Sequence, residues 1–224
     1  MSRSGLPLWP RSVAWLCRVI ARCVIRIRVE GLDNVPRHGA LIVAPNHISN
    51  IDPPLIGGWL GPALDRRPRF LAKEQLFQGV VGWFLRSQGV IAVKAGGSDV
   101  EAYRMARALL EGGEVMVIFP EGTRAADGRL GRPKPGVALL ASRHGVPVLP
   151  VGISGSDRFL RRGQRLPTFG ARVMVRVGAP YQPVAERGGD RRAALAAADE
   201  ELMRRIAALV EPRHRGDWEP WPGA

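Results

Sequence analysis

The chain has 224 residues, which suits one α/β domain with a sizeable hydrophobic core. Hydrophobic residues make up 46% of it and charged residues 24%, proportions that are typical of a globular domain and exclude wholesale disorder. The formal net charge of +13 indicates attraction to polyanions: nucleic acid, an anionic membrane or a phosphorylated substrate.

The N-terminal segment, residues 1–23, is predicted to contain an amphipathic helix that begins near residue 8. It carries Trp9 and Trp15 among apolar residues, with Arg18 and Arg22 one turn apart, a pattern typical of a helix that lies on an anionic membrane surface. An ordinary packing helix with a solvated face is the alternative. The arginines interrupt the apolar stretch, so neither a membrane-spanning helix nor a cleaved signal peptide is predicted.

Cys17 and Cys23 are the only cysteines of the chain. They do not share a helical face, and no Cys/His group has the spacing of a zinc site. We therefore expect no metal and no disulfide scaffold. A reduced, cytoplasmic setting fits this use of cysteine.

From residue 24 onwards, predicted strands and helices alternate. The strands are rich in valine and isoleucine, and they are predicted at 24–29, 40–44, 68–72, 89–93, 114–119, 147–153 and 171–177. The helices are predicted at 53–60, 74–87, 98–111, 135–144 and 190–210. This alternation predicts a single layered α/β domain over residues 24–211, in which helices flank a largely parallel or mixed central sheet. Residues 212–224 are predicted to form a flexible tail.

The segment after the second predicted strand carries His47 and Asp52, just before a helix that begins at Pro53. One interpretation is that Asp52 only caps this helix. The other is that its carboxylate folds back to accept an imidazole N–H, which makes the second ring nitrogen a base for a substrate hydroxyl. Ser49 lacks the strained turn of a serine nucleophile, and residues 152–156 match G-x-S-x-G except at the last position, so a serine-hydrolase mechanism is disfavoured.

A second group of polar residues follows the predicted strand at 114–119. Gly122 permits a tight turn and close approach of a ligand. Arg124 could hold a phosphate through its planar fork, and Glu121 could orient Arg124 or bind a substrate hydroxyl. The alternative is a surface turn with a weak local ion pair. Because this turn also ends a strand, both groups are expected to border one cleft.

These two groups form two specific motifs, and two weaker blocks lie along the chain in a matching order. The specific motifs are Asn46-His47-x-Ser49-x-x-Asp52 and Phe119-Pro120-Glu121-Gly122-Thr123-Arg124; the weaker blocks are 89–94 and 146–152. Together they resemble the glycerolipid acyltransferases, specifically the bacterial 1-acyl-glycerol-3-phosphate acyltransferases, over roughly residues 28–180. The block at 89–94 corresponds to a motif of that family that usually ends in arginine. Here it ends in Lys94, which keeps the charge but loses the bidentate fork.

The resemblance implies that His47, oriented by Asp52, takes the proton of the free hydroxyl of a lysophospholipid. The oxygen then attacks the thioester of acyl-CoA or acyl-carrier protein directly. A thiolate, whose conjugate acid has a pKa near ~8.5, is a good leaving group, so neither an acyl-enzyme nor a cofactor is required. The resemblance also implies that the acceptor substrate is bound by Lys94, Glu121, Gly122, Thr123 and Arg124. The accessory residues that it implies are Asn46, Ser49, Lys73 and Lys134.

Several alternatives remain open from the sequence. The acceptor could be another lysolipid, such as a lyso-ornithine lipid, and the apolar segment 75–85 could pack in the core or line an acyl channel. A non-catalytic membrane-binding protein would leave the His47–Asp52 pair unexplained. The basic cluster of Arg158, Arg161, Arg162 and Arg165 lacks any nucleic-acid-binding motif. We therefore expect an anionic membrane surface as partner, no nucleic acid, and a peripheral location on the cytoplasmic face of the cell membrane.

Overall fold

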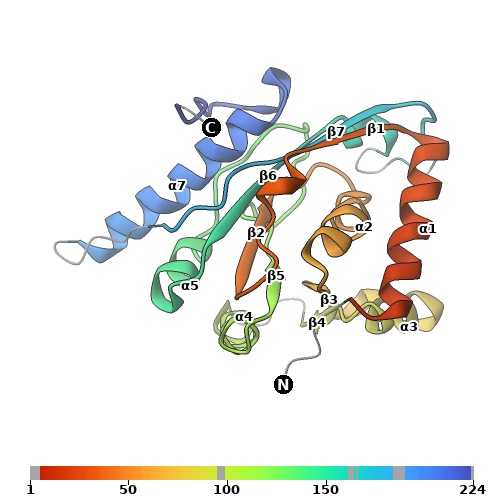
Figure 1. Ribbon diagram of the computed structural model, residues 1–224. Coiled ribbons are helices and arrows are strands. Elements are labelled where there is room, and N and C mark those ends of the chain that lie inside the picture. Colours follow the sequence, from red (N-terminus) through yellow and green to blue (C-terminus); the bar gives the residue numbers. More distant parts are fainter. Residues whose placement is uncertain (1–5, 95–98, 161–163, 165, 184–189, 223–224) are drawn as a thin grey trace.

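A computed structural model describes residues 6–94, 99–160, 164, 166–183 and 190–222 (Figure 1). Seven strands form one mixed sheet in the order β1-β7-β6-β2-β5-β3-β4. Only the β6–β7 pair is antiparallel. All seven predicted strands are confirmed, with the bounds Arg26–Glu30 (β1), Leu41–Pro45 (β2), Pro68–Lys73 (β3), Ile91–Val93 (β4), Val115–Val117 (β5), Val148–Ser154 (β6) and Arg172–Val177 (β7).

The helices cover both faces of the sheet. Their bounds are Leu8–Val24 (α1), Asp52–Leu64 (α2), Gly79–Ser87 (α3), Asp99–Glu111 (α4), Val137–His144 (α5), Ser156–Phe159 (α6) and Arg191–Leu209 (α7), with 3-10 turns at Leu32–Asn34, Glu74–Leu76 and Pro212–His214. The short helix α6 was not predicted. The helix predicted over 74–87 is divided into a 3-10 turn and α3, whose first residue, Gly79, has a left-handed φ of 53°.

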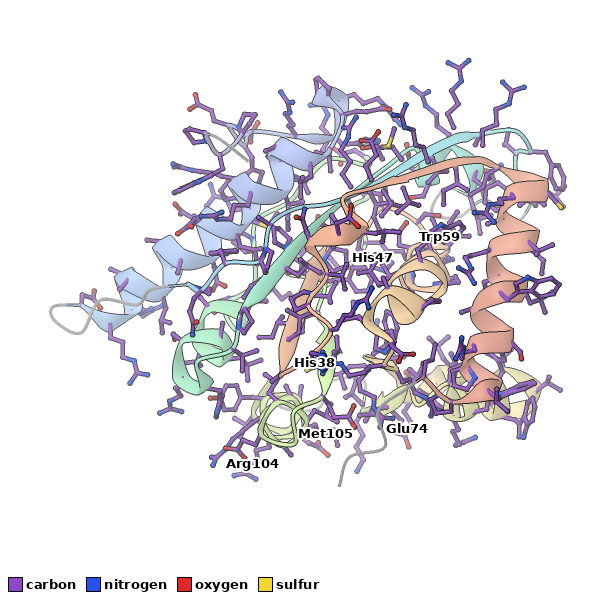
Figure 2. The ribbon with its side chains drawn as sticks, in the orientation of Figure 1. His38, His47, Trp59, Glu74, Arg104 and Met105 are labelled. Carbon is purple, nitrogen blue, oxygen red and sulfur yellow. The ribbon has the colours of Figure 1, made fainter. Side chains whose placement is uncertain are left out.

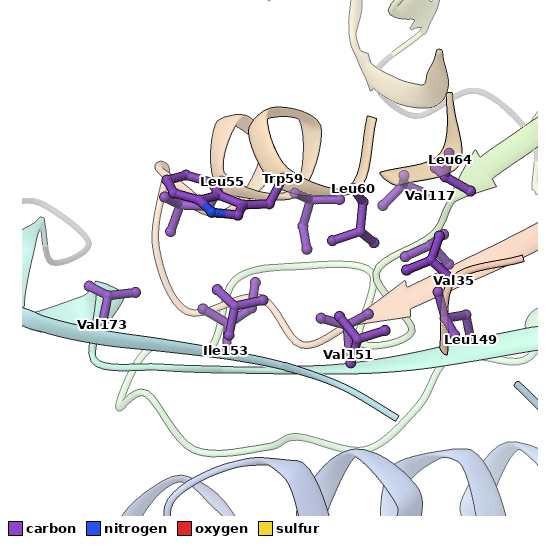
Figure 3. Packing of buried hydrophobic residues seen from close by; sticks show 14 of the residues in the cluster. Val35, Leu55, Trp59, Leu60, Leu64, Val117, Leu149, Val151, Ile153 and Val173 are labelled. Atoms are coloured by element: carbon purple, nitrogen blue, oxygen red, sulfur yellow. The ribbon is translucent and has the colours of Figure 1, made fainter. Parts of the chain in front are cut away.

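Alternating residues of the strands serve two separate hydrophobic cores. Leu41 and Val43 of β2 face the core beneath α1 and α2, whereas Ile42 and Ala44 face the core beneath α4, α5 and α7. Figure 3 shows the first core, in which Leu55, Trp59 and Leu60 of α2 lie over side chains of β6 and β7, with α7 on the far side of the sheet. Because successive side chains of a strand point to opposite faces, both faces of the sheet are buried.

Helix α1 packs directly on α2 and is part of the domain (Figure 1). Gly58 of α2 faces α1, because a Cβ placed there would be in van der Waals contact with Cys17 Cβ at 3.5 Å. Ala14 and Ala21 of α1 are buried, and Ala21 belongs to the core beneath α2.

The C-terminal segment differs from the predicted flexible tail. His214 is 1% exposed, and its backbone carbonyl accepts the N–H of Leu130 at 2.8 Å. Trp218 Nε1 donates to the carbonyl of Gly131 at 3.0 Å, and the Trp221 N–H donates to the carbonyl of Arg204 at 3.0 Å. The proline- and tryptophan-rich segment thus makes specific contacts with the rest of the domain up to Trp221.

Five neighbouring strands run parallel, in the order β6-β2-β5-β3-β4, so their carboxyl ends meet at one edge of the sheet. Figure 2 shows His38, which precedes β2, and His47, which follows it, separated along this direction. The loops that leave this edge contain both motifs found in the sequence. This is where open α/β sheets usually place their ligands.

Candidate active site

The side chains of His47 and Asp52 meet in the turn between β2 and α2. His47 Nδ1 lies 2.9 Å from Asp52 Oδ2, and the same oxygen accepts the backbone N–H groups of Ile48 and Ser49 at 2.8 and 2.7 Å. Because the carboxylate accepts, Nδ1 carries the proton and Nε2 is the acceptor nitrogen of the imidazole. Phe119 stacks on the ring with 4.1 Å between centroids. No described residue hydrogen-bonds Nε2, and the side chain of His47 is 17% exposed.

Helix α2 begins at Asp52, but its carboxylate does not cap the helix. Pro53 and Pro54 follow it and have no N–H to offer, and the N–H of Leu55 already bonds to the carbonyl of Ile51 at 3.0 Å. The carboxylate therefore finds its donors on the other side, in the turn that contains His47. The two prolines explain locally why the fold-back arrangement prevails over the cap.

Ser156 completes the surroundings of Asp52 from the neighbouring strand. It follows β6, is fully buried, and donates its hydroxyl to Asp52 Oδ1 at 2.6 Å. Gly155 makes the turn possible, because its φ is 84° and a Cβ there would lie 1.9 Å from the carbonyl oxygen of Arg172. Asp52 thus accepts four hydrogen bonds and is fully buried.

Sequence reasoning missed Ser156 as part of this site. The signal was present in the near match to G-x-S-x-G at residues 152–156, which follows a buried strand. In that match the serine at the nucleophile position is Ser154, and Ser156 stands where the motif requires glycine. The structure instead places the Ser156 hydroxyl on the carboxylate of Asp52, 104 residues away along the chain.

Glu121, at the carboxyl end of β5, supports the site from the other side. Its Oε1 accepts the backbone N–H of His47 at 3.0 Å, and its Oε2 accepts the backbone N–H of Gly131 at 3.0 Å. Burial raises the pKa of Glu121, and these two backbone hydrogen bonds oppose that rise. In this structure both oxygens hold protein backbone, which differs from the expected contact with Arg124 or a substrate hydroxyl.

Asn46 and Ser49 also bind backbone. The amide of Asn46 donates to the carbonyl of Ile153 at 2.9 Å and accepts its N–H at 2.6 Å, so that it extends the β2–β6 pairing beyond the end of β2. The hydroxyl of Ser49 donates to the carbonyl of Leu160 at 2.9 Å. Both side chains therefore position the turn rather than face solvent.

Arg124 lies close to His47 through the backbone, since the N–H of Ala125 donates to the carbonyl of His47 at 2.9 Å. Its side chain is half-buried and forms no ion pair with any described residue. Gly122 has a φ of 66°, and Lys134 lies over it, because a Cβ there would meet Lys134 Cδ at 2.6 Å. Thr123 is exposed in the same turn. The glycine thus makes room for a second cation beside Arg124.

Lys73 and Lys94 are exposed at the ends of β3 and β4, on the same edge of the sheet. At a strand spacing of about 4.8 Å, these two strands lie roughly 10 and 14 Å from β2. The turn that contains Arg124 is thus joined to His47 through the backbone and carries Lys134 over Gly122, whereas Lys94 lies at the far end of the row. The cluster of Arg161, Arg162 and Arg165 lies outside the described residues.

The arrangement can perform general-base chemistry. A carboxylate held by four donors orients one imidazole, and the free Nε2 can take a proton from a hydroxyl group. Within the described residues, no group of three or more His, Cys, Asp or Glu side chains is placed to hold a metal ion.

Comparison with known proteins assigns this architecture to a family. The family model described as acyltransferase matches residues 26–154, more than half of the chain. A chloroplast 1-acyl-sn-glycerol-3-phosphate acyltransferase of Arabidopsis thaliana is 32% identical over 62% of this chain and 38% of its own. A lyso-ornithine lipid O-acyltransferase of Pseudomonas aeruginosa is 32% identical over 79% of this chain and 70% of its own. The protein therefore belongs to the acyltransferase family.

A solved structure agrees with this assignment. The crystal structure of the 1-acyl-sn-glycerophosphate acyltransferase of Thermotoga maritima has a TM-score of 0.69 and 27% identity, and covers 88% of this chain and 78% of that chain. The chain spans only 38% to 59% of the length of the first curated relatives that it matches.

We predict that Ser156→Ala lowers kcat by about tenfold or more, because a hydrogen bond to a charged group contributes roughly 1.5–3 kcal/mol. The acceptor KM should not change. Without this donor the carboxylate attracts a charged imidazole more strongly, so the acidic limb of the pH–rate profile should move to higher pH. Ser154→Ala is the control, since that buried hydroxyl binds the N–H of Glu211. Equal effects of both variants on the pH profile would refute the positioning role.

Proposed function

We propose that the protein transfers a fatty acyl group from a thioester to the free hydroxyl of 1-acyl-glycerol-3-phosphate and so forms phosphatidic acid. The observation that carries this proposal is the contact of 2.9 Å between His47 Nδ1 and Asp52 Oδ2, which leaves Nε2 free beside a turn with two cations. Relatives named as 1-acyl-sn-glycerol-3-phosphate acyltransferases support the choice of reaction.

The reaction follows from the orientation of His47. Nε2 takes the proton of the acceptor hydroxyl as its oxygen attacks the thioester carbonyl. The tetrahedral intermediate collapses to the new ester and expels the thiolate, which receives the proton back from the imidazolium. Asp52 stabilises the imidazolium between these two steps. The acyl donor is acyl-CoA or acyl-carrier protein, and no cofactor takes part.

The acceptor phosphate is proposed to bind at the turn that contains Gly122, Thr123 and Arg124. Arg124 has no acidic partner among the described residues, and Lys134 lies over Gly122 beside it. Glu121 contributes by holding the backbone of His47. A guanidinium fork and an ammonium group together suit a phosphomonoester.

A second candidate acceptor is a lyso-ornithine lipid, because a relative that is 32% identical over 79% of this chain is named for that substrate. Its headgroup has a singly charged carboxylate in place of a phosphomonoester, so loss of Arg124 should weaken its binding less. The two acceptors can therefore be distinguished by one side chain.

Membrane docking is proposed through exposed apolar side chains on α1 and α3, which lie side by side (Figure 1). We call this the α1–α3 apolar surface; its members are Leu8, Trp9, Trp15, Leu16, Ile20, Val80, Val81, Trp83 and Phe84, each between 38% and 82% exposed. Trp9 joins the two helices, since its Nε1 donates to Ser87 Oγ at 3.1 Å and its ring centroid lies 6.1 Å from that of Trp83. A patch of this kind marks an interaction surface.

The α1–α3 apolar surface also bears on the predicted role of segment 75–85. Phe77 is buried, but Val80, Val81 and Trp83 are exposed, so these three do not pack in the core. No described helix combines the length and apolar character needed to cross a bilayer. We propose peripheral attachment to the cytoplasmic face of the cell membrane, where an anionic leaflet attracts the positive charge of the chain.

His47→Ala should lower acyl transfer at least about 10²-fold, the usual contribution of a general base, while the protein stays folded. The measurement is thiol release from acyl-CoA in the presence of 1-acyl-glycerol-3-phosphate. His38→Ala, which removes an exposed histidine at the other end of β2, is the control and should remain active. Full turnover by His47→Ala would exclude the proposed mechanism.

Arg124→Ala should raise the KM for 1-acyl-glycerol-3-phosphate by about tenfold, because a charge-assisted contact to phosphate is lost. The KM for a lyso-ornithine lipid should rise less, because its carboxylate carries less charge than a phosphomonoester. Both acceptors are assayed with acyl-CoA and with acyl-carrier protein as donor. If the wild type acylates only the lyso-ornithine lipid, that lipid, and not 1-acyl-glycerol-3-phosphate, is the acceptor.

Leu16→Gln combined with Val80→Gln should weaken partitioning into phospholipid vesicles by at least about tenfold, because each residue loses apolar area buried in the bilayer. Val100→Gln, an exposed valine on α4, serves as the matched control. Vesicle sedimentation is the measurement. Unchanged sedimentation of the double variant would show that the α1–α3 apolar surface does not contact lipid.

A further inference from the structure

A groove between α1 and α2 contains a group of arginines that acyl transfer does not use. It has a volume of about 500 Å³ and is lined by Arg11, Ser12, Trp15, Arg18 and Pro62. Pro62 lies ten residues after Asp52 in α2, which at a rise of 1.5 Å per residue is roughly 15 Å along the helix. The groove is thus separate from the catalytic turn.

The arginines of α1 lie on one side of the helix. At 100° per residue, Arg11, Arg18 and Arg22 fall within an arc of about 40°, directly beside the arc of exposed apolar residues. Trp15 belongs to both, because it lines the groove and is also part of the α1–α3 apolar surface. If that surface enters the bilayer, the groove lies at the depth of the phosphate groups.

These positive charges are not neutralised by the protein. Helix α1 contains no acidic residue, and among the described residues no ion pair includes Arg11, Arg18 or Arg22. Arg22 lies 6.0 Å from the ring of Trp59. The positive potential of the groove therefore remains available to an anion.

Arg18 adds a more specific observation. Its stem packs on α2, where Cγ would lie 3.8 Å from a Cβ at Gly58. Its Nε–H is inaccessible to solvent and has no hydrogen-bond partner. The packing on α2 holds the stem of Arg18 in place, and the guanidinium end lines the groove, where its terminal nitrogens can donate to phosphate oxygens.

We propose that the α1–α2 groove binds the phosphate of an anionic glycerophospholipid in the membrane, through Arg11 and Arg18. The lipid headgroup enters beside Trp15 while the α1–α3 apolar surface rests among the acyl chains. The inference rests on the proposed membrane docking and extends it from general attraction to a defined headgroup site. It also sets the orientation of α2, and thus of the catalytic turn, relative to the bilayer.

The experiment compares arginine with lysine, because lysine keeps the charge but lacks the fork. Arg11→Lys with Arg18→Lys should weaken binding to vesicles that contain phosphatidylglycerol by about fivefold or more. Binding to vesicles of phosphatidylcholine alone should be weak for both proteins. Arg191→Lys with Arg192→Lys, on α7, makes the same two exchanges far from the groove and should bind like the wild type.

Wild-type binding by Arg11→Lys with Arg18→Lys would overturn the headgroup site and leave only diffuse attraction. If that variant unfolds, Arg11→Lys alone gives the test, since Arg11 is exposed. Binding of glycerol 3-phosphate that Arg11→Lys with Arg18→Lys loses, while its binding to the vesicles stays at the wild-type level, would assign the groove to a soluble phosphate and refute the lipid. Thiol release by the wild type, measured separately, tests acyl transfer independently of these outcomes.

Discussion

The candidate site depends on one carboxylate that turns away from its own helix. Asp52 begins α2, yet its oxygens accept hydrogen bonds from His47, Ile48 and Ser49 before it and from Ser156, the first residue of α6. A fully buried carboxylate is tolerated only when its acceptor sites are filled, and all four donors here serve that purpose. The orientation of the imidazole follows from this, because the carboxylate can receive only Nδ1–H.

Three neighbouring parallel strands make this arrangement possible. β6 brings Ser156, β2 brings His47, and β5 brings Glu121 to the same edge of the sheet. The C-terminal segment ties two of these loops together, since His214 Nε2 accepts the N–H of Gly155 at 3.2 Å and Nδ1 contacts the carbonyl of Gly128. Parts of the chain remote from the catalytic pair thus determine how rigidly it is held.

Helix α2 connects the chemistry with the surface proposed to face lipid. Its first residue is Asp52, its inner side packs on the sheet through Leu60, and Gly58 receives α1 with its arginines and exposed apolar side chains. A bilayer that binds α1 would therefore orient the catalytic turn through a single rigid helix. The α1–α2 contact that would set this orientation is made by residues that the proposed acyl transfer does not use.

The sequence alone determined the seven strands, most of the helices and the residues of both motifs. These features depend on local patterns: runs of valine and isoleucine between turn residues, and a histidine and an aspartate five positions apart. Only the tertiary structure decided the strand order, the contact between Ser156 and Asp52, the burial of Glu121 between two backbone N–H groups, and the packing of His214. Each of these joins segments that are distant in the chain. Local sequence determines which elements form, whereas the way they pair decides which side chains meet.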